Sequence, residues 1–398
     1  MSKQIQDAYI VAATRTPVAK APRGAFRNTR PDDLLAHVLK AVIAQAPGVD
    51  VARIDDAVIG CAMPEAEQGM NVARIGVLLA GLPDTVAAVT INRFCSSGVQ
   101  AIAMAADRIR TGDADLMLAG GTESMSMVPM MGHKVAMNPA VFTDENIGIA
   151  YGMGITAEKV AERWKVSRED QDAFAVESHR RALAAIAAGE FRDEITPYTL
   201  DDRYPDLAGR SILRDGRVID TDEGPRKDTS MEGLARLRPV FRAGGSVTAG
   251  NASQMSDGAG AVLLASERAI KDHGLVPLAR FVAFSVAGVP AEIMGIGPKE
   301  AIPKALRQAG LSRDQLDWIE LNEAFAAQAL AVMRDLELDP SRVNPLGGAI
   351  ALGHPLGATG AVRAATLVHG LRRRRQKYGM VTMCIGTGMG AAGIFEAL

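Results

Sequence analysis

Two distant stretches of the chain follow one pattern, which indicates how the chain is organised. Residues 97–101 (SGVQA) and residues 359–363 (TGAVR) both begin helical stretches that are rich in alanine. Each stretch leads to a strand that ends in glycines, at 118–122 (LAGGT) and at 383–387 (MCIGT). A repeat on this scale predicts two similar halves packed on each other. The small residues would allow the repeated helices to approach closely.

Short apolar runs alternate with helical patterns over much of the chain, which favours an α/β fold. Pro31 opens one helix, because proline suits the first helical position and the acids after it suit the positive helix end. The stretch from Leu278 (LARFVAFSVAGVP) echoes the segment AYIVAATRTP, which begins with the first expected strand. The other expected elements are strands at 56–60, 86–91, 115–119 and 318–321 and helices at 71–80 and 98–110.

The alternation loosens between residues 125 and 248, where polar and turn residues are more frequent. We interpret this region as an inserted loop domain that lies over the α/β core. The N-terminal half then consists of residues 1–124 plus 249–273, and the C-terminal half of residues 274–398.

The inserted region contains one clear helix and a cluster of methionines. The helix starts at a capping box, Ser167-Arg168-Glu169-Asp170, and runs to Gly189. The methionines suit a flexible apolar binding surface and suit a core equally well, so both interpretations stay open. The cluster comprises Met125, Met127, Met130, Met131 and Met137.

Composition excludes several classes of protein. The 398 residues are 48% hydrophobic and 23% charged, as in a soluble globular protein, and the formal net charge of −2 argues against a nucleic-acid or membrane-surface partner. The four arginines at 372–375 suit a solvated helix end. We expect a cytoplasmic protein, because no signal-peptide pattern and no apolar run of about 18 residues occurs. The three cysteines form no CxxC pair and no disulfide framework.

Cys95 is the first candidate for chemistry. It lies in NRFCSSGVQA, where a strand is expected to turn into a helix, as at the turns that present nucleophiles. A helix N-terminus lowers the pKa of a thiol and directs backbone N–H groups at an oxyanion. The alternative is a buried, inert cysteine.

Two glycine-rich segments carry further candidates. His354 lies in GHPLGATG, and a histidine near a cysteine can act as its general base, although the sequence does not show that the two are near. Cys384 ends a strand in CIGTGMGAAG, where a second thiol could donate and accept a proton. Gly386 in the same segment could leave its backbone N–H free for an oxyanion. The alternatives are a loop histidine and a strand-end cysteine.

Asn322 and Glu323 follow the expected strand at 318–321. Asn322 lies where a helix N-cap belongs, and its amide could instead orient a water or an oxyanion. Glu323 could be a first-turn acid favoured by the helix dipole. All of these candidates fall at strand ends that lead into glycine or a helix, where α/β proteins build their sites.

These residues and their surroundings resemble the thiolases, the acetyl-CoA acyltransferases. The resemblance spans nearly the whole chain, and its motifs occur in family order. They are NRFCSSGVQA, GGTESMS, GNASQMSDGAGA, NEAFAAQ, NPLGGAIALGHPLGATG and CIGTGMGAAG. It implies a thiolase-like fold of two similar α/β halves with a loop domain inserted in the first.

The resemblance also implies roles for the candidates. Cys95 would accept the acyl group of a 3-ketoacyl-CoA in a ping-pong reaction, and His354 would take its proton. Cys384 would protonate the leaving enolate of acetyl-CoA and then deprotonate the incoming CoA. His354, with a water held by Asn322, would form one oxyanion hole. The N–H groups of Cys95 and Gly386 would form the other.

Contacts with CoA transfer from the family less directly. Ser253 and Met153 match residues along the pantetheine arm, Phe325 matches a pocket residue, and Arg226 matches an arginine against the adenine. Short-chain synthetic thiolases carry histidine where this chain has Gly152. The segments SQMSDG and CIGTGMG also look closer to the degradative branch of fatty acid β-oxidation. We therefore expect thiolytic cleavage across chain lengths.

Three alternatives remain on the sequence. The nearest is a biosynthetic acetyl-CoA acetyltransferase that makes acetoacetyl-CoA. A decarboxylating ketoacyl synthase usually brings a second histidine or a histidine and asparagine pair, which Cys384 and Asn322 argue against. A non-catalytic acyl-CoA or lipid-binding protein would bind CoA without turnover.

The resemblance implies no bound cofactor, with CoA as a substrate, and the few histidines show no metal-ligand spacing. Family members are usually homodimers or homotetramers, so we expect a homo-oligomer. Some degradative members join a hydratase/dehydrogenase partner, and the sequence leaves this open.

Overall fold

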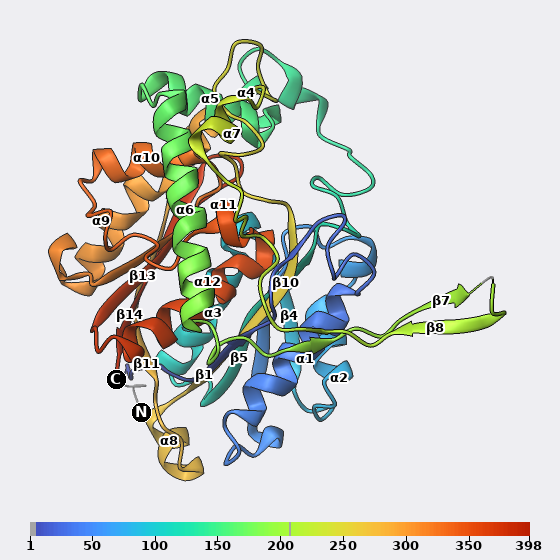
Figure 1. Cartoon of the computed structure of the whole chain (residues 1–398). Helices are drawn as coiled ribbons and strands as arrows, with labels where there is room; N and C mark the ends of the chain where they lie inside the picture. The colour runs from blue at the N-terminus through green and yellow to red at the C-terminus, as the bar shows by residue number, and fades with distance from the viewer. Residues whose placement is uncertain (1–4, 207) are drawn as a thin grey trace.

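The computed structural model describes residues 5–206 and 208–398, and its centre is one large mixed sheet (Figure 1). Within these residues the sheet has ten strands, in the order β12-β13-β14-β11-β1-β10-β5-β3-β4, with β2 paired to β10. The strands are β1 (Tyr9–Arg15), β2 (Ala19–Lys20), β3 (Asp56–Gly60), β4 (Ala87–Ile91), β5 (Leu116–Ser124), β10 (Ser256–Ala265), β11 (Ala279–Gly288), β12 (Trp318–Leu321), β13 (Tyr378–Ile385) and β14 (Met389–Ala397).

The sheet consists of two halves with the same arrangement of strands. In the first half β3 is parallel to β5, β5 is antiparallel to β10, and β10 is antiparallel to β1. In the second half β12, β13, β14 and β11 repeat this series of pairings. The halves meet where β1 pairs with β11 through Tyr9 with Arg280 and Ile10 with Ala279. The α/β fold of two similar halves is therefore as the repeated sequence pattern predicts.

Helices form layers on both faces of each half of the sheet. Helices α1 (Pro31–Ala44) and α2 (Val72–Leu79) share one apolar core with the first half. Helices α9 (Gly297–Ala309) and α10 (Ala326–Asp335) share another with the second half. The largest core surrounds α3 (Ser97–Arg110) and α12 (Leu356–Arg373), which contact each other and both halves. Two short helices complete this part, α8 (Glu267–His273) and α11 (Ala349–Leu352).

Glycines determine how closely α3 and α12 approach each other. A Cβ atom at Gly98 of α3 would lie 2.6 Å from the backbone nitrogen of Ala361 in α12. A Cβ atom at Gly360 of α12 would lie 2.2 Å from the backbone nitrogen of Val99 in α3. Because backbone atoms at such a contact have nowhere to move in a close-packed core, both positions require glycine. The similarity of SGVQA and TGAVR reflects this contact.

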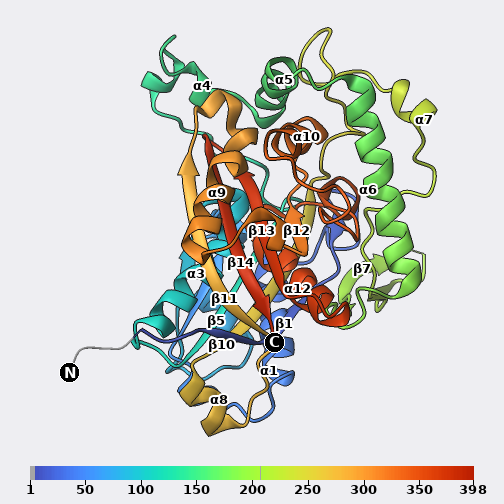
Figure 2. The ribbon, with the colours of Figure 1, turned by 90° about the vertical axis from the view of Figure 1, so that its left-hand side faces the viewer.

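In the part of the chain that the structure describes, four helices and four short strands lie between the last glycines of β5 and the start of β10. Helix α6 begins after Ser167, whose hydroxyl accepts the N–H of Asp170, and ends at Gly189 in the left-handed region. Helices α4, α5 and α7 gather over one end of the sheet, and the hairpin β7–β8 projects away from it (Figures 1 and 2). These elements are α4 (Ile147–Ala150), α5 (Met153–Arg163), α6 (Arg168–Ala188), α7 (Met231–Ala235), β6 (Tyr198–Thr199), β7 (Asp202–Asp206), β8 (Ser211–Asp215) and β9 (Val218–Ile219).

Strand β5 is longer than the sequence pattern predicts. The expected strand stopped at Ala119 because two glycines follow, but β5 continues to Ser124 and is buried throughout. A Cβ atom at Gly121 would lie 2.2 Å from the carbonyl oxygen of Gly357 in α12. Glycine here gives α12 room against the strand, and it does not end the strand.

Substitution of Gly360 by alanine tests the helix contact. The added methyl group overlaps the backbone of α3, so we expect the free energy of unfolding to fall by about 1–3 kcal/mol, measured by chemical denaturation. Gly148→Ala in α4 is the matched control, because a Cβ atom there comes no closer than 3.4 Å to any other atom. Equal stability of the two variants would contradict a steric requirement for glycine in α12.

Candidate active site

Cys95 lies at a constrained turn between β4 and α3. The turn is a short 3-10 helix, Phe94–Ser96, and Phe94 adopts a positive φ of 44°, which is uncommon for a residue with a side chain. The Ser97 hydroxyl accepts the N–H of Arg93 at 2.8 Å and donates to the carbonyl of Phe94 at 2.7 Å. These bonds hold Cys95 at the strand-to-helix join, as the sequence predicts for a presented nucleophile.

The surroundings of the Cys95 thiol differ from the expectation in one respect. Burial raises the pKa of this thiol above its ordinary value, and the charge of Glu123 raises it further. The N–H groups of Gly386 and of Cys95 itself donate toward the sulfur and lower the pKa by less than burial raises it. The prediction that the helix end lowers the pKa of the resting thiol is therefore wrong. The two N–H groups lie beside the sulfur, and their use as an oxyanion hole stays a prediction.

His354 lies in the loop between α11 and α12, and it is almost fully buried. Its Nδ1 atom is 2.6 Å from the hydroxyl of Thr359, and its Nε2 atom is 3.3 Å from Nδ2 of Asn322. Burial, together with the charge of Arg363, lowers the pKa of His354 to about 3, so the imidazole is neutral at pH 7. Thr359 fixes the ring orientation, a role that the sequence alone did not suggest.

Asn322 is not the N-cap of the following helix. The N-cap of α10 is Phe325, while the Asn322 amide faces His354 from the end of β12. Its Oδ1 atom is buried and has no hydrogen-bond partner among the residues that the structure describes. Glu323 is not a first-turn acid either, because it is buried and accepts hydrogen bonds from three other segments. The amide is therefore directed into the site rather than at the backbone of a helix.

Cys384 is fully buried near the end of β13. Burial raises the pKa of its thiol, and the charge of the nearby Cys95 sulfur raises this pKa further. The two thiols are therefore close enough to influence each other's ionisation. Cys384 belongs to an apolar cluster with Phe325 and the partly buried Met153. Cys61, the third free cysteine, is also fully buried, and its sulfur lies 3.9 Å from a carboxylate oxygen of Glu123.

The candidates thus form two groups, and two members of the first group line a cavity. Cys95, Cys384 and Gly386 form the first, and His354 and Asn322 form the second. A cavity of about 500 Å³ is lined by Cys95 and Gly386, and also by Leu356, two residues after His354. In the described structure both ring nitrogens of His354 contact Thr359 and Asn322, and neither contacts Cys95 directly.

The methionine cluster divides between the two interpretations that the sequence left open. Met130, Met131 and Met137 line the cavity that contains Cys95. Met125 is buried in a small apolar cluster that Cys95 packs against. Met63, Met153 and Ile149 add to the apolar wall, so the cavity has a flexible lining.

The expected CoA contacts lie in two places. Met153 lines the cavity with Cys95, and Phe325 packs near Cys384. Ser253 donates its N–H to the carbonyl of Ala324 at 2.9 Å, one residue before Phe325. Arg226 lies apart from them, in a second cavity of about 390 Å³ that Lys20 and His179 also line, and it pairs with Asp228 at 2.8 Å.

Two general properties of the described residues complete the site. They contain no group of three or more histidine, cysteine, aspartate or glutamate side chains arranged to hold a metal ion. None of the helices that the structure describes is long and apolar enough to cross a membrane.

The raised pKa of Cys95 predicts how its alkylation depends on pH. Iodoacetamide reacts with the thiolate, whose fraction grows about tenfold per pH unit below the pKa. A thiol with an ordinary pKa near 8.5 levels off above that pH, whereas we expect the labelling rate of Cys95 to rise still from pH 8 to pH 9.5. Cys95→Ser should remove the label, since Cys61 and Cys384 are fully buried. A plateau below pH 8 would show a lowered pKa instead.

Comparison with known proteins identifies the family. The thiolase N-terminal domain model matches residues 8–268, and the thiolase C-terminal domain model matches residues 275–397. A 3-ketoacyl-CoA thiolase of Bacillus subtilis is 51% identical over 98% of this chain and all of that protein. The peroxisomal 3-ketoacyl-CoA thiolase A of Rattus norvegicus is 47% identical over 98% of this chain and 88% of that protein.

Two further comparisons agree. A β-ketoadipyl-CoA thiolase of Acinetobacter baylyi is 46% identical over 98% of this chain and all of that protein. The crystal structure of an acetyl-CoA acetyltransferase of Bacillus anthracis matches with a TM-score of 0.89 and 40% identity, over the full length of both chains. The resemblance seen in the sequence motifs is thereby confirmed, and this chain belongs to the thiolase family.

Proposed function

We propose that this protein cleaves 3-ketoacyl-CoA with CoA, giving acetyl-CoA and a shortened acyl-CoA. The observation that carries the proposal is the position of Cys95 at the strand-to-helix turn, on the wall of an apolar cavity that Gly386 also lines. The relatives named 3-ketoacyl-CoA thiolase support the same reaction.

In the first half-reaction Cys95 is the nucleophile. Its thiol is protonated at rest, so His354, which is neutral, takes the proton as the sulfur attacks the 3-keto carbon. The new C–S bond forms, the bond between carbons 2 and 3 breaks, and acetyl-CoA leaves as an enolate. Asn322 and His354 stabilise the enolate oxygen, and Cys384 protonates the enolate carbon.

In the second half-reaction the acyl group moves from Cys95 to CoA. Cys384 takes the proton of the incoming CoA thiol, whose sulfur attacks the acyl-enzyme carbonyl. The N–H groups of Cys95 and Gly386 hold the resulting oxyanion until the bond to Cys95 breaks. His354 then returns its proton to the Cys95 thiolate, which restores the resting enzyme. Loss of one such donor typically costs about 10²–10³ in rate. The acyl-enzyme between two substrates makes the kinetics ping-pong.

CoA itself extends from the thiols across the inserted region, residues 125–248, which we propose as the CoA-binding loop domain. Met153, Ser253 and Phe325 line the arm close to Cys384. The adenine end lies toward Arg226, whose cavity also contains Lys20 and is bounded by Gly250 and Gln254, next to Ser253. Two cations at that cavity suit the phosphates of CoA.

A broad range of acyl chain lengths follows from the cavity beside Cys95. Its walls are mostly methionine and other apolar side chains, which adapt to alkyl chains of different length. Gly152 lines it, and a Cβ atom there would meet no other atom within 4 Å. An acetyltransferase restricted to acetoacetyl-CoA, the alternative that the Bacillus anthracis structure favours in part, would not require this space.

We also propose a homo-oligomer in a reducing compartment such as the cytoplasm. Strand β4 is the last strand of the sheet within the described residues, and Val89 on it is 41% exposed. An exposed edge strand presents unpaired backbone groups that can pair with another chain. The three cysteines are free thiols, as expected where disulfides are kept reduced.

Thiolysis across chain lengths tests the proposal. We expect the wild-type protein to cleave 3-ketoacyl-CoA substrates of four carbons and of ten or more, and Cys95→Ala to cleave none. Gly152→His should narrow the cavity and lower the ratio of long-chain to four-carbon kcat/KM by about tenfold.

The matched control is Gly216→His, because Gly216 is an exposed glycine that meets no atom within 4 Å. Its chain-length profile should equal that of the wild type. Cleavage of acetoacetyl-CoA alone would establish the acetyltransferase alternative. CoA binding without any turnover would establish the non-catalytic alternative.

A further inference from the structure

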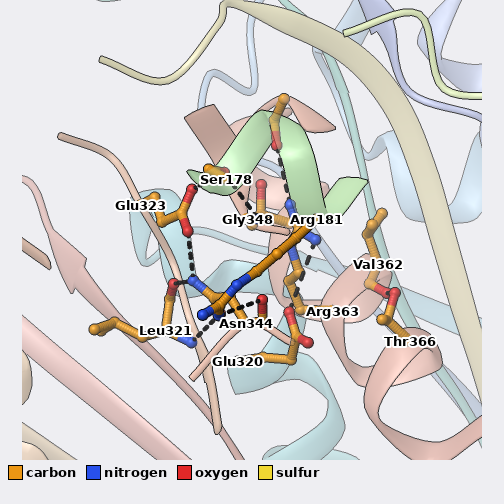
Figure 3. Close-up of polar contacts among 12 residues, drawn as sticks. Ser178, Arg181, Glu320, Leu321, Glu323, Asn344, Gly348, Val362, Arg363 and Thr366 are labelled. Atoms are coloured by element: carbon orange, nitrogen blue, oxygen red, sulfur yellow. Dashed lines mark hydrogen bonds and ion pairs between the residues drawn. The ribbon is translucent and has the colours of Figure 1, made fainter. Parts of the chain in front are cut away.

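Glu323, the neighbour of Asn322, is a buried carboxylate that no step of the proposed mechanism uses. It accepts hydrogen bonds from the Ser178 hydroxyl at 2.6 Å and from Nδ2 of Asn344 at 2.9 Å (Figure 3). It also accepts the N–H of Ile350 at 3.2 Å. These three donors belong to α6, to the loop after α10 and to α11. One side chain therefore joins three segments that are distant in sequence.

The loop that carries Asn344 determines where Asn322 lies. Asn344 donates to the carbonyl of Leu321 at 2.7 Å and accepts its N–H at 2.9 Å, so it is bound to the end of β12. The same Asn344 amide then donates to Glu323, on the other side of Asn322 in the sequence. Asn322 is thus held from both sides by one asparagine.

The third contact leads to His354. A Cβ atom at Gly348 would lie 2.1 Å from the carboxyl carbon of Glu323, so the carboxylate rests directly on this glycine. The N–H of Gly348 donates to the Ser178 hydroxyl at 3.1 Å. Gly348 and Ile350 begin the short segment through α11 that ends at His354. The carboxylate therefore contacts both the residue next to Asn322 and the start of the His354 loop.

Helix α6 connects this contact to the second cavity. Ser178 bonds Glu323, while the next residue, His179, accepts the backbone N–H of Arg226 at 3.1 Å. Arg181, three residues after Ser178, donates to the carbonyl of Val343 at 2.7 Å and supports the loop that holds Asn344. The helix that borders the proposed adenine site is thus bonded to the loops behind the oxyanion hole.

We propose that Glu323 is a positioning residue that sets the distance between Asn322 and His354, with Ser178 of α6 as its anchor in the inserted region. The inference rests on the proposed roles of Asn322 and His354 in stabilising the enolate. Only cleavage of the bond between carbons 2 and 3 uses that pair together. Transfer of an acyl group between Cys95 and CoA uses His354 as the proton carrier and the N–H groups of Cys95 and Gly386, but it does not use Asn322. A displaced Asn322 should therefore slow thiolysis more than exchange.

Glu323→Gln is the informative substitution because it preserves the size of the side chain. The new NH₂ group faces donors, so at least one hydrogen bond among Ser178, Asn344 and Ile350 is lost. Two rates are measured on the variant, thiolysis of acetoacetyl-CoA and exchange of labelled CoA into acetyl-CoA. Exchange forms and breaks the thioester on Cys95 but breaks no carbon–carbon bond.

Misplacement of Asn322 relative to His354 should lower the kcat of thiolysis about 10- to 100-fold, because small displacements cost rates of this size. The ratio of thiolysis to exchange should fall about tenfold or more, and the KM for CoA should change less than about twofold. Ser178→Ala should lower the ratio of thiolysis to exchange by less than Glu323→Gln does. Titration of Cys95 with iodoacetamide gives the active concentration of each variant.

Glu194→Gln is the matched control. Glu194 is also a buried carboxylate, bonded to Arg15 at 2.6 Å and Thr366 at 2.7 Å, away from Asn322. The Glu194→Gln variant should be less stable than the wild type but should keep the wild-type ratio of thiolysis to exchange. Equal losses of thiolysis and exchange in Glu323→Gln, or no loss, would overturn the inference.

Asn322→Ala separates failure of this inference from failure of the proposed function. If Asn322→Ala lowers the ratio and Glu323→Gln does not, the positioning role alone is wrong. If the wild type itself shows no thiolysis, the proposed function is wrong.

Discussion

The contact between α3 and α12 is the interaction on which the site depends. Helix α3 begins two residues after Cys95, and α12 begins two residues after His354. Gly98 and Gly360 let these helix starts touch through their backbones. The buried carboxylate of Glu123 adds a second connection, because it accepts the N–H of Gly357 in α12 at 2.8 Å and the N–H of Ala62 after β3 at 2.7 Å. In the proposed mechanism the first half contributes Cys95 and the second half contributes His354 and Cys384, and the glycine contact holds the starts of α3 and α12 together.

Burial then decides the electrostatics of these groups. It raises the pKa of Cys95 and Cys384 and lowers that of His354 to about 3, so all three are neutral at rest. Neutral groups avoid the cost of keeping a charge away from water. In the proposed mechanism charge develops only when a substrate carbonyl is attacked, and the N–H groups of Cys95 and Gly386 and the Asn322–His354 pair are the groups proposed to stabilise it. The site is thus built for charges that exist only during the reaction.

Much of the fold could be predicted from local patterns. Strands β3 and β12 have the predicted bounds, and the capping residue of α6 and the glycine at its end are as expected. Local patterns gave the wrong prediction where a contact with a distant segment determines the structure. The glycines of β5 suggested an end to the strand, because the pattern does not show that α12 lies against them. Asn322 suggested an N-cap, because only the folded chain brings His354 beside it.

The missing parts of the site have the same cause. Glu123 and Glu323 act through partners elsewhere in the fold, so no spacing in the sequence marks them. Thr359 lies only five residues after His354, but the sequence does not show that the ring turns toward its hydroxyl. The pKa of Cys95 depends on burial by elements from both halves, while the sequence shows only the favourable helix end. Residue types at strand ends identify a site, whereas its electrostatics and its supports come from tertiary contacts.

The most direct measurement is the mass of the peptide that contains Cys95 after one turnover. The protein is mixed with a 3-ketoacyl-CoA in the absence of free CoA, quenched in acid and digested. The account predicts an acyl group two carbons shorter than the substrate on Cys95, with one acetyl-CoA released per acylated site. An acyl group on another residue, or release of acetyl-CoA without any acylated Cys95, would contradict it.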